Sequence, residues 1–160
     1  MGAASRIALV ALRIWQLICS IIVVGILARF LRVLSEAGAT RDGRVVYGII
    51  VASISIVFAI VFIAPFLYSF LSFPMDFALF VMWLVLFCLL ITRTGTKTCS
   101  SPWFWNYWGY YWGGWWRNPF FIDGPGDIAY SGCGHWRTVL AFSFMASSFI
   151  GSLRRVSLVG

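Results

Sequence analysis

The segment LICSIIVVGILA, residues 17–28, consists of apolar and small residues and carries no charge. A helix needs about 20 mostly apolar residues to cross the hydrocarbon core of a bilayer, which is roughly 30 Å thick. The apolar run extends back to Ile7, so residues 7–28 reach that length and predict a transmembrane helix. Arg29 and Arg32 follow it in place of a small-residue cleavage site, which argues against a removable signal peptide.

Three further apolar stretches follow this first one. We expect them to form helices at residues 45–64, 75–91 and 136–153. The composition agrees, because 61% of the residues are hydrophobic, 11% are charged and the mean hydropathy is +0.91, whereas soluble domains are about 45–50% apolar and 25% charged. The sequence therefore predicts an all-α integral membrane protein. We expect a single domain of residues 1–160, in which four transmembrane helices form a bundle and residues 92–135 form a long aromatic-rich loop.

The charged residues lie mainly between the apolar stretches. The 12 Lys and Arg residues and the 5 Asp and Glu residues give a formal net charge of +7. Basic residues at the ends of membrane spans meet lipid headgroups, and here they form no run or single face of the kind that binds nucleic acid. We expect membrane lipids as partners and no binding of nucleic acid.

Three strongly polar residues, Arg13, Gln16 and Asp76, fall within or beside the predicted spans. Arg13 lies about two turns into the first span, so we expect its side chain to snorkel back to the nearer membrane surface. Asp76 lies in the first turn of the third span, where a carboxylate suits the positive end of the helix dipole. A fully intramembrane acid would instead indicate a functional site; we favour the capping role.

Small residues recur at intervals of three and four along two of the spans. Such a stripe lies on one face of a helix and lets a neighbouring backbone approach closely. The predicted helix-packing seams consist of Gly48, Ala52, Ser55 and Ala59 in the second span, and of Ser143, Ser147 and Gly151 in the fourth. We expect these seams to pack the bundle and to support lateral association with a second copy or with other membrane proteins.

The loop between the third and fourth spans is rich in Trp and Tyr. Its aromatic residues are Trp103, Trp105, Tyr107, Trp108, Tyr110, Tyr111, Trp112, Trp115 and Trp116. Rings with an apolar body and a polar tip partition to the headgroup boundary. Ser101-Pro102 is a favourable helix start and Gly113-Gly114 a favourable stop, so we predict a short amphipathic element that lies on the membrane. In a helix, Trp105, Trp108 and Trp112 would share one face.

Other roles for the aromatic loop stay open on the sequence. Stacked rings near Arg can bind single-stranded nucleic acid, and aromatic platforms can also bind a sugar or a sterol. The loop could equally pack as an extracellular cap without a ligand. We favour the cap or interfacial anchor.

Cys99 and Cys133 bracket the aromatic loop. They form a disulfide if the loop faces an oxidising compartment, and they are two unpaired thiols if it faces the cytosol. We favour the disulfide. Cys19 and Cys88 lie inside apolar stretches, where a thiol behaves as a small hydrophobe.

The sequence has no pattern of residues that indicates catalysis. It contains one His, no Ser-His-acid set and no Gly-rich phosphate loop followed by Lys. Cys133 and His135 lie near Asp127, but a closed zinc site needs four ligands and Cys99 is distant in the sequence. We therefore expect no catalytic residue, no metal and no cofactor, and we predict that the protein is not an enzyme.

Several motifs follow one another in a specific order. Arg13 and Gln16 stand early in the first span, PMDFALFVMW opens the third at residues 74–83, and Cys99 precedes the Trp/Tyr run. GCGHWR at residues 132–137 then leads into AFSF. Together they resemble the fungal branch of the MARVEL-domain tetraspan family over nearly the whole chain. The resemblance implies an M-shaped bundle of four helices with both termini in the cytosol and no catalytic residues.

The same resemblance implies a function in plasma-membrane subdomain organisation, membrane apposition or vesicle trafficking, at the plasma membrane or a secretory-pathway membrane. One alternative is a small transporter or channel subunit, in which Arg13, Gln16 and Asp76 would line a water-filled path. Another is a receptor for a sterol or a sugar, with a pocket beneath the aromatic loop.

The distribution of basic residues points against cytosolic termini. Arg6, Arg13, Arg154 and Arg155 lie on the side of the termini, and more basic residues lie in the loops on the opposite side. The positive-inside rule taken alone would place those loops in the cytosol. We expect cytosolic termini on the basis of the resemblance and of the disulfide.

Overall fold

The computed structural model describes residues 3–62, 69–95, 99–118, 120, 130 and 132–159. Within these ranges it places all side chains except those of residues 3–6, 8–9, 69–73 and 149–159. Everything said below about the structure concerns this part of the chain.

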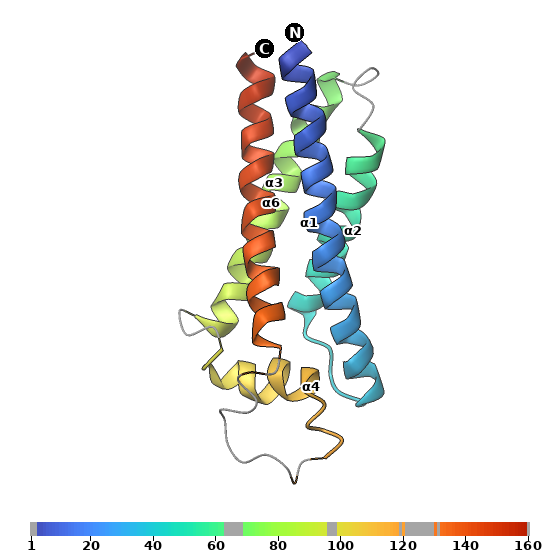
Figure 1. Cartoon of the computed structure of the whole chain (residues 1–160), viewed down its shortest axis with the longest axis vertical. Helices are drawn as coiled ribbons and strands as arrows, with labels where there is room; N and C mark the ends of the chain where they lie inside the picture. The colour runs from blue at the N-terminus through green and yellow to red at the C-terminus, as the bar shows by residue number, and fades with distance from the viewer. Residues whose placement is uncertain are drawn as a thin grey trace.

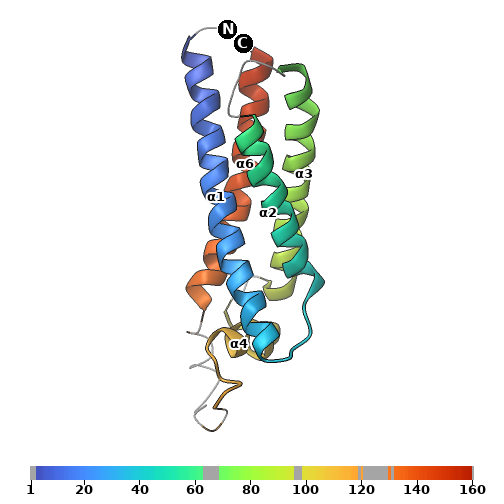
Figure 2. The same ribbon diagram turned by 90° about the vertical axis from the view of Figure 1, so that its right-hand side faces the viewer.

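Four long helices lie side by side along one axis (Figures 1 and 2). They are α1 at Ala3–Glu36, α2 at Gly43–Val61, α3 at Ser69–Thr94 and α6 at Cys133–Val159. α1 and α3 each pack against both α2 and α6, so they stand diagonally opposite each other. The start of α1 and the end of α6 lie at the same end of the bundle (Figure 1). The prediction of an all-helical protein is confirmed.

Three of these helices contain segments long and apolar enough to cross a membrane. The segments are Val10–Glu36, Gly43–Val61 and Pro74–Thr94. The chain is therefore a multi-pass membrane protein. The predicted fourth span, residues 136–153, falls inside α6 and stays a prediction, because the side chains of residues 149–159 lie outside the described part of the chain.

α1 is longer than the sequence pattern predicts. The first helix was expected to end at residue 28, yet it continues through Arg29 and Arg32 to Glu36. Arg, Leu and Glu are good helix formers, and nothing in this stretch interrupts the backbone hydrogen bonds. The helix ends before Gly38, whose φ of +65° is a left-handed conformation that favours glycine.

α3 begins earlier than predicted, and α6 ends later. The third helix was expected at residues 75–91, but α3 starts at Ser69 and Pro74 lies inside it. Pro74 is the sixth residue of α3, so it removes one backbone hydrogen bond, the one to the carbonyl of residue 70, and the helix continues past it. α6 likewise continues beyond residue 153, its expected end, and through Arg154 and Arg155, because charged residues do not break a helix.

A short helical segment lies across the end of the bundle away from the termini (Figure 1). It consists of the π-helix η1 at Phe104–Gly109 and the single turn α4 at Tyr110–Trp112. Large aromatic side chains fill the core at this end, and Phe30, Phe104, Trp108 and Trp136 are fully buried. The aromatic loop is therefore packed onto the helices, with part of its rings inside the protein.

Candidate functional site

A buried network of polar side chains joins α1, α2 and α3. We call it the polar core; its members are Arg13, Gln16, Ser20, Ser55, Asp76 and Trp83. Arg13 Nη2 forms an ion pair of 2.5 Å with Asp76 Oδ2, and Arg13 Nη1 donates to Gln16 Oε1 at 3.2 Å. Because α1 and α3 are diagonal to each other, this ion pair bridges the width of the bundle.

The hydroxyl of Ser55 is the centre of the polar core. It accepts hydrogen bonds from Gln16 Nε2 at 3.0 Å and from Trp83 Nε1 at 3.3 Å, and it also bonds to the Ser20 hydroxyl at 3.0 Å. Ser20 in turn donates to the Gln16 carbonyl at 2.8 Å. A buried polar group is stable only when it is hydrogen-bonded, and here each side chain finds its partner on a neighbouring helix or on the preceding turn.

Two sequence predictions about these residues are wrong. Arg13 does not snorkel to the surface: its exposed fraction is 7%, and its guanidinium points into the bundle toward Asp76. Asp76 does not cap a helix start, because α3 begins at Ser69 and has no acid in its first turn. A buried guanidinium is costly without a partner, so pairing with the carboxylate on α3 replaces the expected escape to water.

The small-residue seams face the interior of the chain's own bundle. Gly48, Ala52, Ser55 and Ala59 are all buried. A Cβ added at Gly48 would lie 2.8 Å from Leu27 Cδ1 and 3.2 Å from Leu86 Cδ1, so α2 packs closely between α1 and α3. The α2 seam therefore packs the chain's own helices, as expected, and its residues are not exposed to another copy; lateral association stays a prediction.

The seam of α6 is similar where it is described. Ser143 is fully buried and Ser147 nearly so. Their hydroxyls donate to carbonyls of their own helix, Ser143 to Val139 and Ser147 to Phe144, each at 2.7 Å. The surroundings of Gly151, the third residue of this seam, lie outside what the structure describes.

The aromatic loop forms what we call the aromatic cap, residues 99–117. Its predicted limits agree with the structure: Ser101 Oγ accepts the Phe104 N–H at 3.2 Å, and the helical turn ends at Gly113 and Gly114. Gly114 has a φ of +75°, which favours glycine. The middle of the segment is a π-helix, which the sequence did not reveal.

Trp108 is the buried centre of the aromatic cap. Its ring lies 4.2 Å from that of Phe30, 4.7 Å from Trp136 and 5.3 Å from Trp112. Its Nε1 donates to the Gly132 carbonyl at 3.1 Å. Trp108 therefore holds the cap to α1 and α6 and is covered by protein.

The other Trp and Tyr rings of the cap are partly exposed. Eight aromatic residues that were predicted to lie at the membrane interface are half-buried in the structure: Trp103, Trp105, Tyr107, Tyr110, Tyr111, Trp112, Trp115 and Trp116. Trp105 Nε1 donates to the Cys99 carbonyl at 3.0 Å, and Trp112 stacks on Trp108. Their contact with lipid stays a prediction.

A disulfide joins Cys99 to Cys133, with their Cα atoms 5.8 Å apart. It links the start of the aromatic cap to the first residue of α6. The predicted pairing is confirmed. Cys19 is free and buried, and Cys88 is free and exposed on α3.

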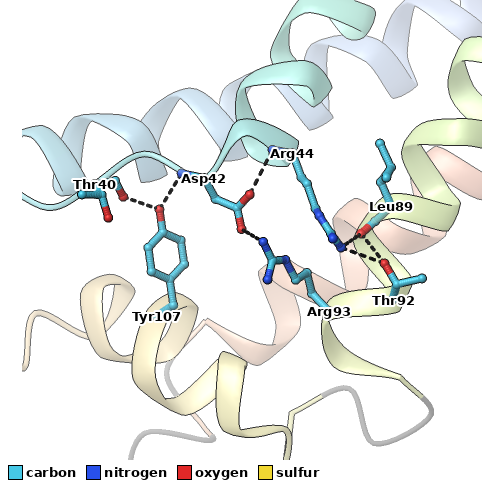
Figure 3. A network of polar contacts seen from close by, with 7 residues as sticks. All are labelled: Thr40, Asp42, Arg44, Leu89, Thr92, Arg93 and Tyr107. Carbon is cyan, nitrogen blue, oxygen red and sulfur yellow. Dashed lines mark hydrogen bonds and ion pairs between the residues drawn. The ribbon is translucent and has the colours of Figure 1, made fainter.

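The connector between α1 and α2 is held by Tyr107 (Figure 3). The phenol donates to the Thr40 carbonyl at 2.8 Å and accepts the Asp42 N–H at 2.9 Å. Burial, opposed in part by the hydrogen bond from Asp42, raises the pKa of the Tyr107 phenol above its usual value. This link between the cap and the connector was missed, because a Tyr among many carries no sequence signal for it.

Asp42 and Arg44 extend the same network to α3 (Figure 3). Asp42 caps α2 by accepting the Arg44 N–H at 3.0 Å, and it forms an ion pair of 3.2 Å with Arg93. Arg44 Nη1 donates to the Leu89 carbonyl at 3.0 Å and to Thr92 Oγ1 at 2.8 Å. The N-cap could have been found from Asp42 ahead of the apolar run; its pairing with Arg93 could not.

In the segment GCGHWR, residues 132–137, the structure explains why particular residues stand at several positions. Gly132 has a φ of +73°, and a Cβ there would lie 2.7 Å from Trp112 Cγ. The ring of His135 lies 4.6 Å from that of Trp112. Trp136 is buried and donates through Nε1 to Thr94 Oγ1 at 3.3 Å.

No metal centre is found in the described part of the chain, where no three His, Cys, Asp or Glu side chains lie close enough to share an ion. Asp127, which the sequence placed near Cys133 and His135, lies outside the described residues.

A family model described as a membrane-associating domain, MARVEL, matches residues 6–151 of the sequence. No curated protein and no solved structure matches the chain. The match covers both the polar core and the aromatic cap, and it agrees with the apolar helices of the structure. The chain therefore belongs to the MARVEL family of membrane-associating domains.

Proposed function

We propose that this protein is a non-enzymatic organiser of membranes, which acts in membrane subdomain formation, membrane apposition or vesicle trafficking. In this proposal α6 is the fourth transmembrane helix and both termini lie in the cytosol. α6 has 27 residues, a length of about 40 Å as a helix, and it packs along α1 and α3. These features support a fourth crossing.

The observation that carries the proposal is the mutual pairing in the polar core. Arg13 bonds to Asp76 and Gln16, and Ser55 bonds to groups from α1 and α3. A channel or transporter needs polar groups that face a path and exchange partners with the passing ion or solute. Polar groups that bond to one another support a stiff structural body instead.

The outer faces of the helices suit contact with lipid chains. Exposed branched apolar side chains include Ile14, Ile18, Ile21, Ile50, Val57, Ile60, Val81, Leu84 and Val85. Since the small-residue seam of α2 is buried in the bundle, association with further copies or other membrane proteins would use these outer faces. Lipid packing around them is the simplest route to a membrane subdomain.

The disulfide supports the sidedness in the proposal. Disulfides persist in oxidising compartments and are rare in the cytosol. The Cys99–Cys133 bond therefore favours a lumenal or extracellular aromatic cap. The termini, at the opposite end of the bundle in Figure 1, then face the cytosol.

Reconstitution of the full chain into giant vesicles tests the organising role. A fluorescent terminal tag reports the distribution of the protein, and membrane conductance is recorded in parallel. We expect enrichment in patches or at vesicle–vesicle contacts, with conductance equal to that of protein-free vesicles.

A matched pair of variants locates the effect. Cys99→Ser with Cys133→Ser loosens the aromatic cap and should reduce the enrichment, whereas Cys88→Ser removes an exposed thiol outside the cap and should not. A uniform distribution of the wild-type protein argues against the organising role. Raised conductance together with that distribution favours the channel alternative.

A further inference from the structure

An exposed cluster of basic and aromatic side chains lies where α1 meets the aromatic cap. We call it the arginine–indole patch; it consists of Arg29, Arg32, Trp112 and His135. The guanidinium of Arg29 lies over the Trp112 ring, with Cζ 5.5 Å from the ring centroid. Arg29, Arg32 and His135 are exposed, and Trp112 is half-buried between them and the core.

The indole at the centre of the patch is held in place from below. Trp112 stacks on Trp108 with an interplanar angle of 9°, and the His135 ring packs against it at 4.6 Å. Gly132 lies so close that a Cβ there would meet Trp112 at 2.7 Å. The patch therefore presents a closely packed indole ring beneath the exposed Arg29 guanidinium.

The arginines of the patch have no acidic partner in the described part of the chain. Its three acids are engaged elsewhere: Asp76 pairs with Arg13, Asp42 with Arg93 and Glu36 with Arg117. Guanidinium groups recognise phosphate through charge and paired donors. Arg29 and Arg32 are thus available to an external anion.

The patch stands at the end of an exposed apolar stripe on the same helix. Ile14, Ile18 and Ile21 are 45%, 43% and 53% exposed. With Gly25, Arg29 and Arg32 they recur at intervals of three and four, which places them on one face of α1. From Ile21 to Arg29 the rise along the helix is about 12 Å. The apolar stripe lies within the candidate span Val10–Glu36.

Gly25 leaves a gap in this stripe. A Cβ built there meets no atom within 4 Å, so the backbone between Ile21 and Arg29 is open to the surroundings. An acyl chain and its glycerol can approach α1 more closely at this point than over the neighbouring isoleucines.

We propose that this face of α1 and the aromatic cap bind one anionic phospholipid. The headgroup phosphate lies at Arg29 and Arg32 above the Trp112 ring, and an acyl chain follows the isoleucine stripe past Gly25. The proposal rests on the membrane crossing of α1 and not on the organising role. A failure here would leave the vesicle-contact result of the proposed function untouched.

Spin-labelled lipids test the site on the full chain reconstituted in phosphatidylcholine vesicles. The fraction of labelled lipid immobilised by the protein is compared for phosphatidylglycerol and phosphatidylcholine. A guanidinium that contacts the headgroup at a membrane surface favours anionic lipid by about fivefold, so we expect at least about fivefold selectivity for phosphatidylglycerol from Arg29 and Arg32. Equal immobilisation of the two lipids by the wild-type protein would overturn the proposal.

Matched double variants separate the site from the general charge of this end of the bundle. Arg29→Gln with Arg32→Gln should bring the selectivity close to one. Arg41→Gln with Arg137→Gln removes the same charge from exposed arginines at this end but outside the patch, and it should leave the selectivity within about twofold of wild type. Equal losses in the two double variants would indicate a diffuse charge effect and overturn the site.

Two further measurements distinguish a lipid from a free phosphate. Gly25→Leu keeps every charge and fills the gap, so it should lower phosphatidylglycerol immobilisation. Soluble glycerol phosphate should not displace the labelled lipid. Displacement by glycerol phosphate, with no effect of Gly25→Leu, would assign the patch to a soluble phosphate and overturn the lipid site. The thermal transition of each variant in detergent confirms that it is folded.

Discussion

Ser55 shows how a small residue can serve both packing and polar bonding in a membrane protein. It lies on the small-residue face of α2, where α1 and α3 come close, and it is fully buried. Its single hydroxyl bonds to Gln16, Ser20 and Trp83 from those two helices. A larger residue would separate the helices, and an apolar one would leave buried donors without a partner.

The Arg13–Asp76 ion pair gives the first prediction. Asp76→Asn leaves a buried guanidinium without its counter-charge, and we expect a loss of about 3–5 kcal/mol in the free energy of unfolding. Thermal unfolding in a mild detergent, followed by near-ultraviolet circular dichroism, measures the change.

The double variant Arg13→Gln with Asp76→Asn is the control for this prediction. It removes both charges and should recover most of the loss, because a neutral pair has a small desolvation cost. If Asp76→Asn unfolds at the wild-type temperature, or if the double variant is as unstable as the sum of its parts, the ion pair does not hold α1 to α3.

Gly132 gives the second prediction. Gly132→Ala places a Cβ at a φ of +73° and against the Trp112 ring. Both effects oppose folding, by about 2–4 kcal/mol together. Gly134→Ala is a matched control in the same segment, since a Cβ there meets nothing within 4 Å; it should change the stability by less than about 1 kcal/mol. Equal melting temperatures for the two variants would rule out the proposed constraint.

Tyr107 gives a prediction about pH. Its pKa in the folded protein is raised, chiefly by burial, above the value of about 10 expected in the unfolded chain. The stability from its hydrogen bonds is therefore complete below pH 10 and is lost as the pH rises from 10 toward the folded-state pKa. Tyr107→Phe should be less stable at pH 8 by about 1 kcal/mol and should lose less on going to pH 11. An identical decline in wild type and variant would contradict the assignment.

At the scale of elements, the aromatic cap is attached to the bundle at three places. The disulfide ties it to α6, Tyr107 ties it to the connector before α2, and Trp108 packs on Phe30 of α1. A short helical segment of this length is not stable alone in water. Its order therefore depends on these attachments.

Removing the disulfide should loosen the aromatic cap more than the helices. Cys99→Ser with Cys133→Ser reopens a loop with a sequence separation of 34, which costs about 3–4 kcal/mol in the loop-entropy description. Hydrogen exchange should rise in residues 99–117 and change little in α2. An increase in hydrogen exchange that is equal across the chain, or no increase anywhere, would contradict an attachment role confined to the cap.

The sequence predicted those element limits that depend on local chemistry. Ser101-Pro102 and Gly113-Gly114 bound the cap as expected, because capping and stopping need only neighbouring residues. The ends of α1 and α3 were misplaced, because Arg29 and Pro74 are compatible with a helix as well as with its end. Local patterns do not decide between the two.

The pairing in the polar core could not be predicted from the sequence. Arg13 and Asp76 were recognised as unusual membrane positions, but they lie 63 residues apart. Their contact depends on which helices stand diagonally across the bundle, and hydropathy carries no information about that order.

Cys99 and Cys133 were paired correctly because they are the cysteines that bracket the loop.

At the scale of the whole molecule, the two ends of the bundle differ in chemistry. The end with the aromatic cap carries the disulfide, the half-exposed rings and the exposed arginines Arg29, Arg32, Arg41 and Arg137. Toward the other end, Arg13 is neutralised by Asp76. This asymmetry suits a protein that meets different surroundings on the two faces of a membrane. The proposed arrangement, with both termini on one face and the aromatic cap on the other, requires an even number of crossings.

The most direct test of that claim is the accessibility of both termini and of the cap in one preparation of sealed vesicles. Protease-cleavable tags are placed at each terminus, and Asn118→Cys, an exposed position of the connection after the cap, is labelled with an impermeant maleimide. The account predicts that both tags share one side and that Asn118→Cys lies on the other. A C-terminal tag on the side of Asn118→Cys would mean that α6 does not cross, and it would contradict the account.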